Sequence, residues 1–423
     1  MHDTTSNPQT ATDAVADPGA AEIVVGVPSQ NHAGSVALVL RAAQAGLGDE
    51  SLRGRGSLLV SADAGSSDGT CQQVHALRSE LPLLRELEPN DRAASAAGSG
   101  PETRALRVIL QQAAEVHARA CVVLDASVTS MTADWIASLV RPILDDELDL
   151  VVPCHARHKL DGAITNGIVY PFTRALYGKR VRQPLGSVFA LSGRLVDHFL
   201  AKHVWDLEVT RLATDARATC ESICSGFGVC QAFLGPAEHA GGGPAQDLSS
   251  ILASVLSSVF DEMSRNVAFW QKVRNSEPIR RYGSPVELAG DPPPVDVQRM
   301  WESFRLGCRT LQEVWAVVLS PATLLALKYL AREEVGGAAL ADDLWARIVY
   351  DFALGYRLHV MNRGHLLRAL TPLYLGWLAC FVRKNGTTPF QNVEQRVQQL
   401  SLVFEAQKPY LISRWRWPDR FSP

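Results

Sequence analysis

The sequence lacks a strong excess of charge of either sign. Its 423 residues include 41 Lys and Arg against 44 Asp and Glu, a formal net charge of -3. A protein that binds nucleic acid or an anionic membrane through a basic surface normally carries a clear positive excess. We therefore expect no nucleic-acid partner, although the local cluster of Lys179, Arg180 and Arg182 has enough positive charge to meet a phosphate.

Long uninterrupted apolar runs are also missing. The most apolar stretch, residues 366–382, contains Arg368, Pro372 and Gly376. It barely approaches the roughly 20 apolar residues that a membrane-spanning helix needs. We interpret it as a buried helix of a helical domain and expect no membrane span.

Features of secreted proteins are absent as well. Residues 1–21 contain no aromatic residue and no apolar segment of a signal peptide, so we expect a disordered tail. The eight cysteines are scattered, and the three nearest to one another, Cys220, Cys224 and Cys230, fit no common zinc spacing. Because thiols stay reduced in the cytosol, we expect reduced, mostly buried cysteines and a cytoplasmic protein.

The chain is too long for one compact core, and its first part has the pattern of an α/β sheet. Between residue 22 and about residue 234, short β-rich runs alternate with helical periodicity. This pattern predicts a sheet with helices on both faces, whose ligands bind at the carboxyl ends of the strands. The predicted buried parallel strands are Ile23–Val27, Leu58–Ser61, Cys121–Leu124 and Leu148–Val152, and a helix is predicted from about Glu102 to Ala118.

After about Gly243 the strand signals fade and long amphipathic stretches follow. They cover Leu248–Phe269, Val297–Ala331 and Ala338–Tyr356, with a stiff proline run at 291–294 between the first two. We expect a helical C-terminal region that packs on the sheet. The predicted division is a tail at 1–21, an α/β domain at 22–270 and a helical domain at 271–423.

Polar residues directly follow the first two predicted strands. The first strand ends in Val27-Pro28-Ser29-Gln30-Asn31, and a Gly/Ser-rich turn after the second contains Asp63, Asp68 and Thr70. A carboxylate at this position can meet a nucleotide base or ribose. Asp68 and Thr70 suit the cap of the next helix equally well. No Gly-X-Gly-X-X-Gly follows the first strand, which argues against a dinucleotide site.

The third predicted strand runs directly into Asp125-Ala126-Ser127. A carboxylate after a buried strand can bind a divalent cation, which prefers oxygen ligands. Asp125 can equally be a turn residue at the end of its strand. The spacing alone leaves both interpretations open.

Together these features resemble the GT-A glycosyltransferases of the family-2-like superfamily, in particular the enzymes that make glucosyl- or mannosyl-glycerate and their phosphorylated forms. The resemblance covers about residues 22–270 and, more loosely, the helical tail. The segments that carry it, in matching order and spacing, are Val27 to Asn31, Asp63 to Thr70, Asp125-Ala126-Ser127 with Asp134-Trp135, Arg157 to Thr165, Gln183-Pro184-Leu185-Gly186, Asp215 and His239.

The resemblance implies a Rossmann-like GT-A domain, a nucleotide-diphosphate sugar as donor, and transfer of a hexose to a small hydroxy acid such as glycerate or phosphoglycerate. It implies a divalent cation, Mg²⁺ or Mn²⁺, held by Asp125, Ser127 and His239. Asp215 matches an acidic residue near the transfer centre, and Arg157 and Thr165 match positions that hold the acceptor. The implied donor-binding residues are Pro28, Asn31, Asp63, Asp68, Gly100, Asp125, Gln183, Leu185 and Gly186.

Three positions depart from the pattern of the resembled enzymes. Ser127 replaces the second acid of an Asp-X-Asp motif, and Ser99 replaces a lysine between two glycines. The acidic residue that follows Gln-Pro-Leu-Gly-Gly in those enzymes is also absent, because this chain reads Gly186-Ser187-Val188. A hydroxyl is a weaker metal ligand than a carboxylate. The three changes together indicate altered donor handling, weaker metal dependence or lost catalysis.

The acceptor candidates follow the fourth predicted strand, in the segment Cys154–Gly162. The guanidinium of Arg157 can bind both oxygens of a carboxylate, and His158 and Lys159 add positive character that suits a phosphorylated acid. A solvated basic loop would show the same charges. The spacing from Arg157 to Thr165 favours the functional interpretation.

Two functions from different classes follow. The first is a sugar transferase whose helical C-terminal region closes the acceptor side and mediates self-association as a homodimer, with Trp301, Trp315, Trp345 and Trp377 mainly in its core. The second is a catalytically degenerate protein that binds sugar nucleotides or serves as an assembly module.

Overall fold

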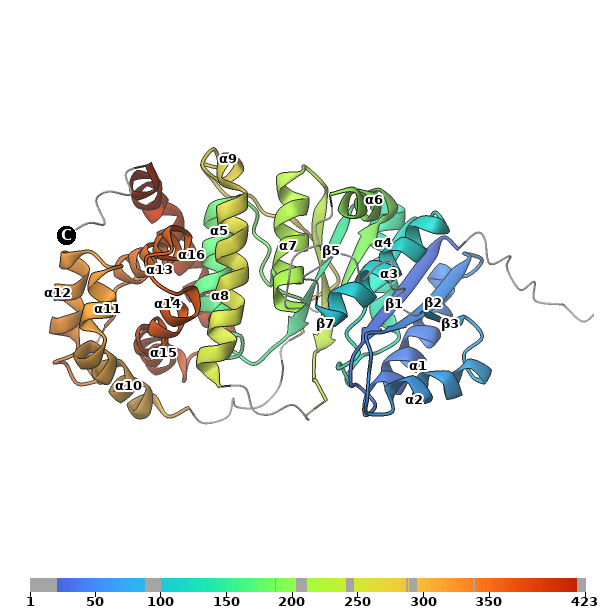
Figure 1. The fold of residues 1–423 in the computed structure, drawn as a ribbon, viewed down its shortest axis with the longest axis horizontal. Helices are drawn as coiled ribbons and strands as arrows, with labels where there is room; N and C mark the ends of the chain where they lie inside the picture. Colours follow the sequence, from blue (N-terminus) through green and yellow to red (C-terminus); the bar gives the residue numbers. More distant parts are fainter. Residues whose placement is uncertain are drawn as a thin grey trace, which may run out of the picture.

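The computed structural model describes residues 21–87, 100–186, 188–202, 211–240, 247–286, 288, 295–337 and 339–416, and of residues 211–215 only the backbone. Its first part is an eight-stranded sheet in the order β3-β2-β1-β4-β6-β5-β7-β8 (Figure 1). The strands are β1 Ile23–Ser29, β2 Ser57–Asp63, β3 Leu84–Leu87, β4 Ala120–Val123, β5 Leu150–Ala156, β6 Phe189–Ser192, β7 Val229–Pro236 and β8 Arg280–Tyr282.

Every strand pair is parallel except the two that involve β6, which runs antiparallel to β4 and to β5. Because both neighbours of β6 run opposite to it, β4 and β5 point the same way. The carboxyl ends of β1, β2, β4, β5 and β7 therefore meet at one edge of the sheet. The four predicted strands are confirmed with small shifts of their ends, but β4 and β5, which we predicted as parallel strands, each also pair antiparallel with β6.

Helices cover both faces of the sheet, as the alternating pattern predicted. The burial of β1 shows why, because alternate residues of the strand enter two separate hydrophobic clusters. Val24 belongs to the cluster that includes α3, whereas Val25 belongs to the cluster of α1 and α4. The helices of this part are α1 Val36–Leu47, α2 Thr70–Ala76, α3 Pro101–Glu115, α4 Asp134–Asp146, α5 Tyr170–Tyr177, α6 Gly193–Ala201 and α7 Arg211–Cys224.

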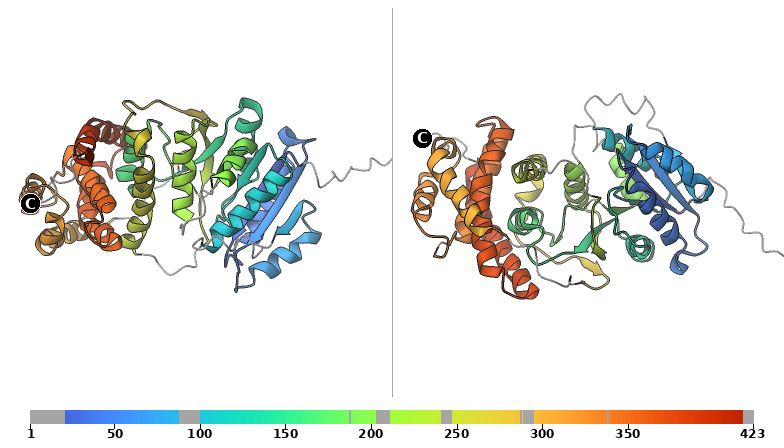
Figure 2. Two further views of the ribbon diagram at one scale, coloured as in Figure 1. Left: turned by 45° about the horizontal axis from the view of Figure 1, so that its top comes forward. Right: turned by 90° about the horizontal axis from the view of Figure 1, so that it is seen from below.

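The C-terminal region is mainly helical, also as predicted, and its orange and red helices lie at the far end from the blue strands in both views of Figure 2. The predicted core tryptophans Trp301, Trp315, Trp345 and Trp377 are all buried. The helices are α8 Leu248–Arg265, α9 Val267–Trp270, α10 Val297–Thr310, α11 Gln312–Ala316, α12 Pro321–Leu330, α13 Asp342–Leu358, α14 Arg363–Ala369, α15 Thr371–Asn385 and α16 Phe390–Arg416.

The sheet part and the helical part share one core. A single hydrophobic cluster runs from Val24 of β1 to Trp415 of α16, and α16 packs directly on α5. The last strand, β8, pairs with β7 although it follows residue 270, where we placed the end of the α/β domain. The sheet therefore reaches Tyr282, beyond that division.

The apolar stretch near residue 370 forms consecutive helices within the helical bundle. The segment Arg363–Asn385 is the one described stretch whose length and hydropathy would suit a membrane span, and 72% of its apolar window is buried in the protein. Arg368 and Pro372 interrupt it. All eight cysteines lie in described parts of the chain and have free thiols, as predicted.

Candidate active site

Hydrogen bonds join the loops that leave β1 and β2. The parallel register ends with Ser29 opposite Asp63, so both loops start at the same edge of the sheet. Asn31, in the left-handed conformation with φ 57°, donates its backbone N–H to Ser66 Oγ at 2.9 Å and accepts one from the Ser67 N–H at 2.9 Å. The Ala33 N–H donates to Asp68 Oδ2 at 3.0 Å. The polar segment predicted to meet the nucleotide is thus one connected unit.

Asp63 and Asp68 are the acceptors that hold this unit. Burial opposes ionisation of Asp63, but the Ser66 hydroxyl and the backbone N–H groups of Ser66 and Gly65 outweigh it and lower its pKa. The hydroxyl of Thr70 is the largest cause that lowers the pKa of the exposed Asp68. Asp68 also accepts the N–H of Thr70, the first residue of α2, at 3.1 Å. Asp68 thus accepts the first N–H of α2, although the N-cap position is Gly69 and Thr70 lies inside the helix; a nucleotide contact is compatible with this arrangement.

Asp125 and His239 approach each other, as predicted. The segments after β4 and β7 pair through the Val128–His239 bridge, with the Ala240 N–H donating to the carbonyl of Ser127 at 2.7 Å. This pairing brings His239 Nδ1 within 3.7 Å of Asp125 Oδ2 and 3.0 Å of Ser127 Oγ. The Ser127 hydroxyl also lies 2.6 Å from Asp125 Oδ1. The three implied metal ligands thus converge.

These donors fit a divalent cation only in part. Asp125 Oδ2 and His239 Nδ1 are close enough for one cation to reach both atoms, and carboxylate and imidazole are common ligands of such cations. Within the described ranges, however, no group of three or more His, Cys, Asp or Glu side chains gathers that could hold a metal. A cation here would need further oxygen ligands from a bound substrate.

A cavity of about 610 Å³, here called the main cavity, opens beside Asp125 and His239. It lies at the carboxyl edge of the sheet, where β4, β5 and β7 end. Three of the implied donor-binding residues line it: Asp125, Leu185 and Gly186. Its other lining residues are His155, Ala156, Arg157, His158, Asp161, Gly162, Pro236, Ala237, Glu238 and Leu288.

A second cavity of about 400 Å³, here called the side cavity, adjoins the main one. The segment from His155 to His158, together with Asp161, forms a wall common to both cavities. The far wall comes from α16, so the helical region contributes directly to this space. The remaining lining residues are Cys154, Lys159, Asn166, Arg182, Gln183, Phe233, Arg281, Pro285, Val286, Phe390, Gln391, Val393 and Glu394.

Arg157 stands in the common wall, where the carboxylate of Asp161 is near enough to favour its charged form. No hydrogen bond or ion pair joins its guanidinium to any residue that the structure describes. Burial, followed by the nearby Arg182, lowers its pKa, but a guanidinium stays protonated at neutral pH. Gly162 lies against it, because a Cβ at that position would be 2.6 Å from Arg157 Nη1. The absence of a side chain at Gly162 leaves room for the guanidinium, whose charge is available to a ligand.

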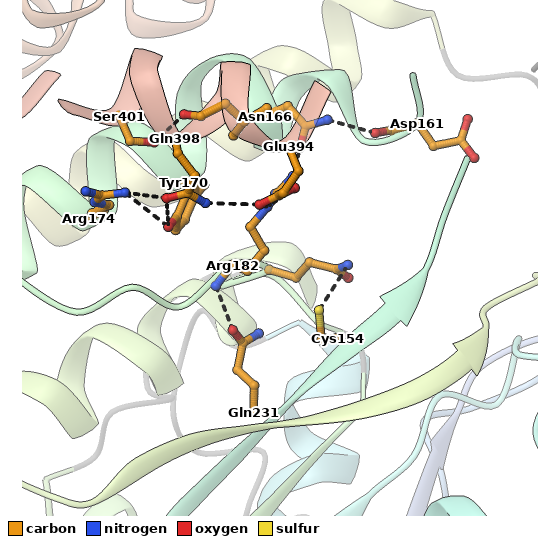
Figure 3. Close-up of polar contacts among 12 residues, drawn as sticks. Cys154, Asp161, Asn166, Tyr170, Arg174, Arg182, Gln231, Glu394, Gln398 and Ser401 are labelled. Atoms are coloured by element: carbon orange, nitrogen blue, oxygen red, sulfur yellow. Dashed lines mark hydrogen bonds and ion pairs between the residues drawn. The ribbon is translucent and has the colours of Figure 1, made fainter. Parts of the chain in front are cut away.

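Arg182, in contrast, is fully engaged at the side cavity (Figure 3). Its Nε and Nη2 donate to both carboxylate oxygens of Glu394 at 2.9–3.0 Å, and Nη2 also donates to Asn166 Oδ1 at 2.8 Å. Asn166 in turn donates to the carbonyl of Asp161 at 3.1 Å. Asn166 lies in a π-helical turn, Thr165–Val169, whose Gly167 carbonyl accepts a bond from Trp345 Nε1.

His155 is a buried imidazole in the wall between the two cavities. Burial lowers its pKa to about 4, and the positive charge of Arg157 adds to this effect. Its Nδ1 lies 3.1 Å from the carbonyl of Gly235, and its ring packs on Trp135 at 5.0 Å between centroids. Because an imidazole of this pKa is neutral at pH 7, Nδ1 is the donor in that bond and Nε2 is left as an acceptor.

Of the other predicted site residues, some contact the walls of the cavities and others do not. Gln183 is buried and bonds the backbone of His155 through both ends of its amide, which fixes the wall of the cavities. Thr165 begins the π-helical turn and lines neither cavity; Asn166 beside it lines the side cavity instead. Pro28 lies within β1 and Gly100 directly precedes α3; neither residue lines either cavity.

Some predicted features lie outside the described residues. The backbone of Asp215 belongs to α7, but its side chain is not described, nor are Ser99 and Ser187. Sequence reasoning missed His155, Asn166, Arg182 and Glu394. The only signal for Arg182 was the basic cluster that contains it.

No protein-family model matches the chain, and no curated protein matches it. Among solved structures, it is similar to glucosyl-3-phosphoglycerate synthase from Mycobacterium tuberculosis in complex with Mn²⁺, UDP and glucosyl-3-phosphoglycerate, with 18% identity over 58% of this chain and 80% of that one and a TM-score of 0.44. The same enzyme with Mn²⁺, UDP-glucose and phosphoglyceric acid matches with 21% identity, the same coverage and a TM-score of 0.41. A protein described only as mycobacterial has 19% identity, coverage of 58% and 75%, and a TM-score of 0.44.

Proposed function

We propose that this protein transfers a hexose from a nucleotide-diphosphate sugar to a small anionic hydroxy acid such as glycerate or phosphoglycerate. The observation that carries the proposal is Arg157, a cation in the wall of a cavity whose guanidinium has no ion pair or hydrogen bond with any described residue. Asp125 and His239 converge at the same cavity. An anion-binding group and a cation-binding group facing one space suit an anionic acceptor and a diphosphate donor.

The donor side is the carboxyl edge of β1, β2 and β4. The unit tied by Asp63 and Asp68 would receive the nucleoside, and the diphosphate would extend toward Asp125 and His239. A cation held by these two residues would supply positive charge to the departing nucleoside diphosphate. Leu185 and Gly186 would bound the sugar in the main cavity.

The acceptor side is the wall around Arg157. Its guanidinium would bind the acceptor's carboxylate through two parallel hydrogen bonds and so fix the hydroxyl near the anomeric carbon. In the reaction the acceptor oxygen bonds to the anomeric carbon, the bond from that carbon to the diphosphate breaks, and the hydroxyl proton passes to the departing diphosphate oxygen. Asp215, in α7, remains our proposed acidic residue near the transfer centre.

The second candidate is a degenerate protein that binds sugar nucleotides without transferring the sugar. Ser127 favours it, because a hydroxyl stands where the resembled enzymes have an acid and its bond to Asp125 occupies one carboxylate oxygen. We also propose that the protein is cytoplasmic and homodimeric. The free thiols and the large helical region support these two proposals respectively.

A donor-by-acceptor screen with purified protein tests the function. Uridine, guanosine and adenosine diphosphate sugars would each be mixed with glycerate, 3-phosphoglycerate and neutral polyols, and products detected by mass spectrometry. Transfer to an acid supports the proposal, and transfer only to neutral polyols contradicts the anionic acceptor. Nucleotide binding without transfer or donor hydrolysis would establish the degenerate alternative.

A further inference from the structure

A carboxylate from the far end of the chain enters the side cavity. Glu394 lies near the start of α16, 212 positions after Arg182, and forms a bidentate ion pair with it. Arg182 is mostly buried, with 14% of its side chain exposed, and its guanidinium also packs over the ring of Tyr170. The pair lowers the pKa of Glu394 against the effect of its own burial, so this carboxylate is ionised.

The Glu394 carboxylate affects the charge balance of the side cavity. Among the described lining residues, Arg157, Lys159, Arg182 and Arg281 are cationic, whereas Asp161 and Glu394 are anionic. Four positive and two negative charges leave an excess of two positive charges. Arg182 is the cation that Glu394 neutralises, whereas Arg157 remains unpaired among the described residues.

We propose that Glu394 is a specificity-determining residue that limits the negative charge of the acceptor. This inference rests on the proposed function, in which the acceptor's carboxylate binds Arg157. With Arg182 already paired to Glu394, a second anionic group on the acceptor meets a neutral pair rather than a free guanidinium. Glu394 thus acts through Arg182 and weakens the binding of phosphorylated acids relative to simple hydroxy acids.

The selectivity between two acids separates this role from a structural one. Loss of the Glu394 charge strengthens attraction for every negative charge nearby, and a phosphorylated acid carries more of them than glycerate does. A packing defect at α16 would instead weaken both acids together. A change in the ratio of the two affinities therefore indicates an effect of charge, whereas an equal loss of both affinities indicates a packing defect.

The test compares Glu394→Gln with Glu405→Gln by calorimetry, using glycerate and 3-phosphoglycerate as ligands in the presence of a nucleoside diphosphate. Glu405 is the matched control, because it lies on the same helix and pairs with an arginine, Arg174, but neither residue lines the cavity. Glu394→Gln should shift the affinity ratio toward 3-phosphoglycerate by about tenfold, the equivalent of about 1.4 kcal/mol. Glu405→Gln should leave the ratio unchanged.

A second variant guards against misfolding of the first. Arg182→Gln leaves the Glu394 carboxylate unpaired at the cavity and should shift the ratio in the opposite direction, toward glycerate. An unchanged ratio in folded Glu394→Gln, or the same shift in Glu405→Gln, would overturn the inference while the proposed function stands. A parent protein that binds neither acid would overturn both.

Discussion

His239 Nδ1 lies 3.7 Å from Asp125 Oδ2 because the segments that follow β4 and β7 pair as a short antiparallel bridge. The side chain of Asp125 is 4% exposed and that of His239 is half exposed. One partner is thus fixed in the protein and the other faces the main cavity. A ligand that enters the cavity meets both.

The nucleotide pocket depends on Asp63. Asp63→Ala removes the acceptor for the Gly65 and Ser66 N–H groups, each bond worth about 1 kcal/mol, and should weaken nucleoside diphosphate binding by at least about tenfold. Calorimetry with the folded variant measures this. Asp49→Ala is the control, because Asp49 also accepts a turn N–H, that of Ser51, at the start of a short helix before β2. Unchanged affinity in Asp63→Ala would refute its role.

Metal binding should depend on the nucleotide. With Asp125 and His239 as its strong ligands and Ser127 as a neutral one, the parent should bind Mn²⁺ weakly and bind it more tightly once a nucleoside diphosphate adds oxygens. Ser127→Asp should tighten Mn²⁺ binding without nucleotide. Tight binding by the nucleotide-free parent, or no binding in either state, would contradict this account.

His155 should make stability fall in mild acid. Its folded pKa of about 4 lies below the ordinary value of 6.5, so the unfolded chain takes up the proton first. Its contribution is complete above pH 6.5 and is lost as pH falls toward 4, by about 2 kcal/mol between pH 7 and pH 5. Urea unfolding at both values should show a smaller loss for His155→Gln. Equal losses in the two proteins would disprove the assignment.

Gly167 should be essential for the packing of the helical region on the acceptor wall. A Cβ at this position would lie 2.3 Å from two ring atoms of Trp377, so Gly167→Ala should cost about 1–3 kcal/mol of stability. Gly34→Ala is the control, since nothing lies within 4 Å of its added Cβ. Denaturant midpoints of both variants check the prediction, and a Gly167→Ala midpoint equal to the parent's would contradict it.

The sequence predicts β1, β2, β4 and β5 and misses β3, β6, β7 and β8. β1 and β2 were predicted because they contain runs of apolar residues, most of which the structure buries. β8 consists of Arg280, Arg281 and Tyr282, which carry little apolar signal; β7 was missed although it is mostly buried, and so was the fully buried β6. Its antiparallel direction depends on tertiary pairing, which no local pattern encodes.

The candidate site shows the same division. The Asp125–His239 pairing was accessible through the resemblance, because order along the chain preserves it. Glu394 was not, because its importance arises from an ion pair with Arg182, 212 positions away. His155 was missed because its altered pKa comes from burial, which a single sequence does not display.

The most direct measurement is sugar transfer by the parent and by Arg157→Ala, with glycerate and 3-phosphoglycerate as acceptors. Loss of a charge-assisted pair in a closed site costs on the order of 2–5 kcal/mol, so kcat/KM should fall by at least about tenfold while nucleotide affinity stays near that of the parent. If Arg157→Ala transfers sugar to both acids as well as the parent does, the acceptor is not anchored at Arg157 and the account is wrong.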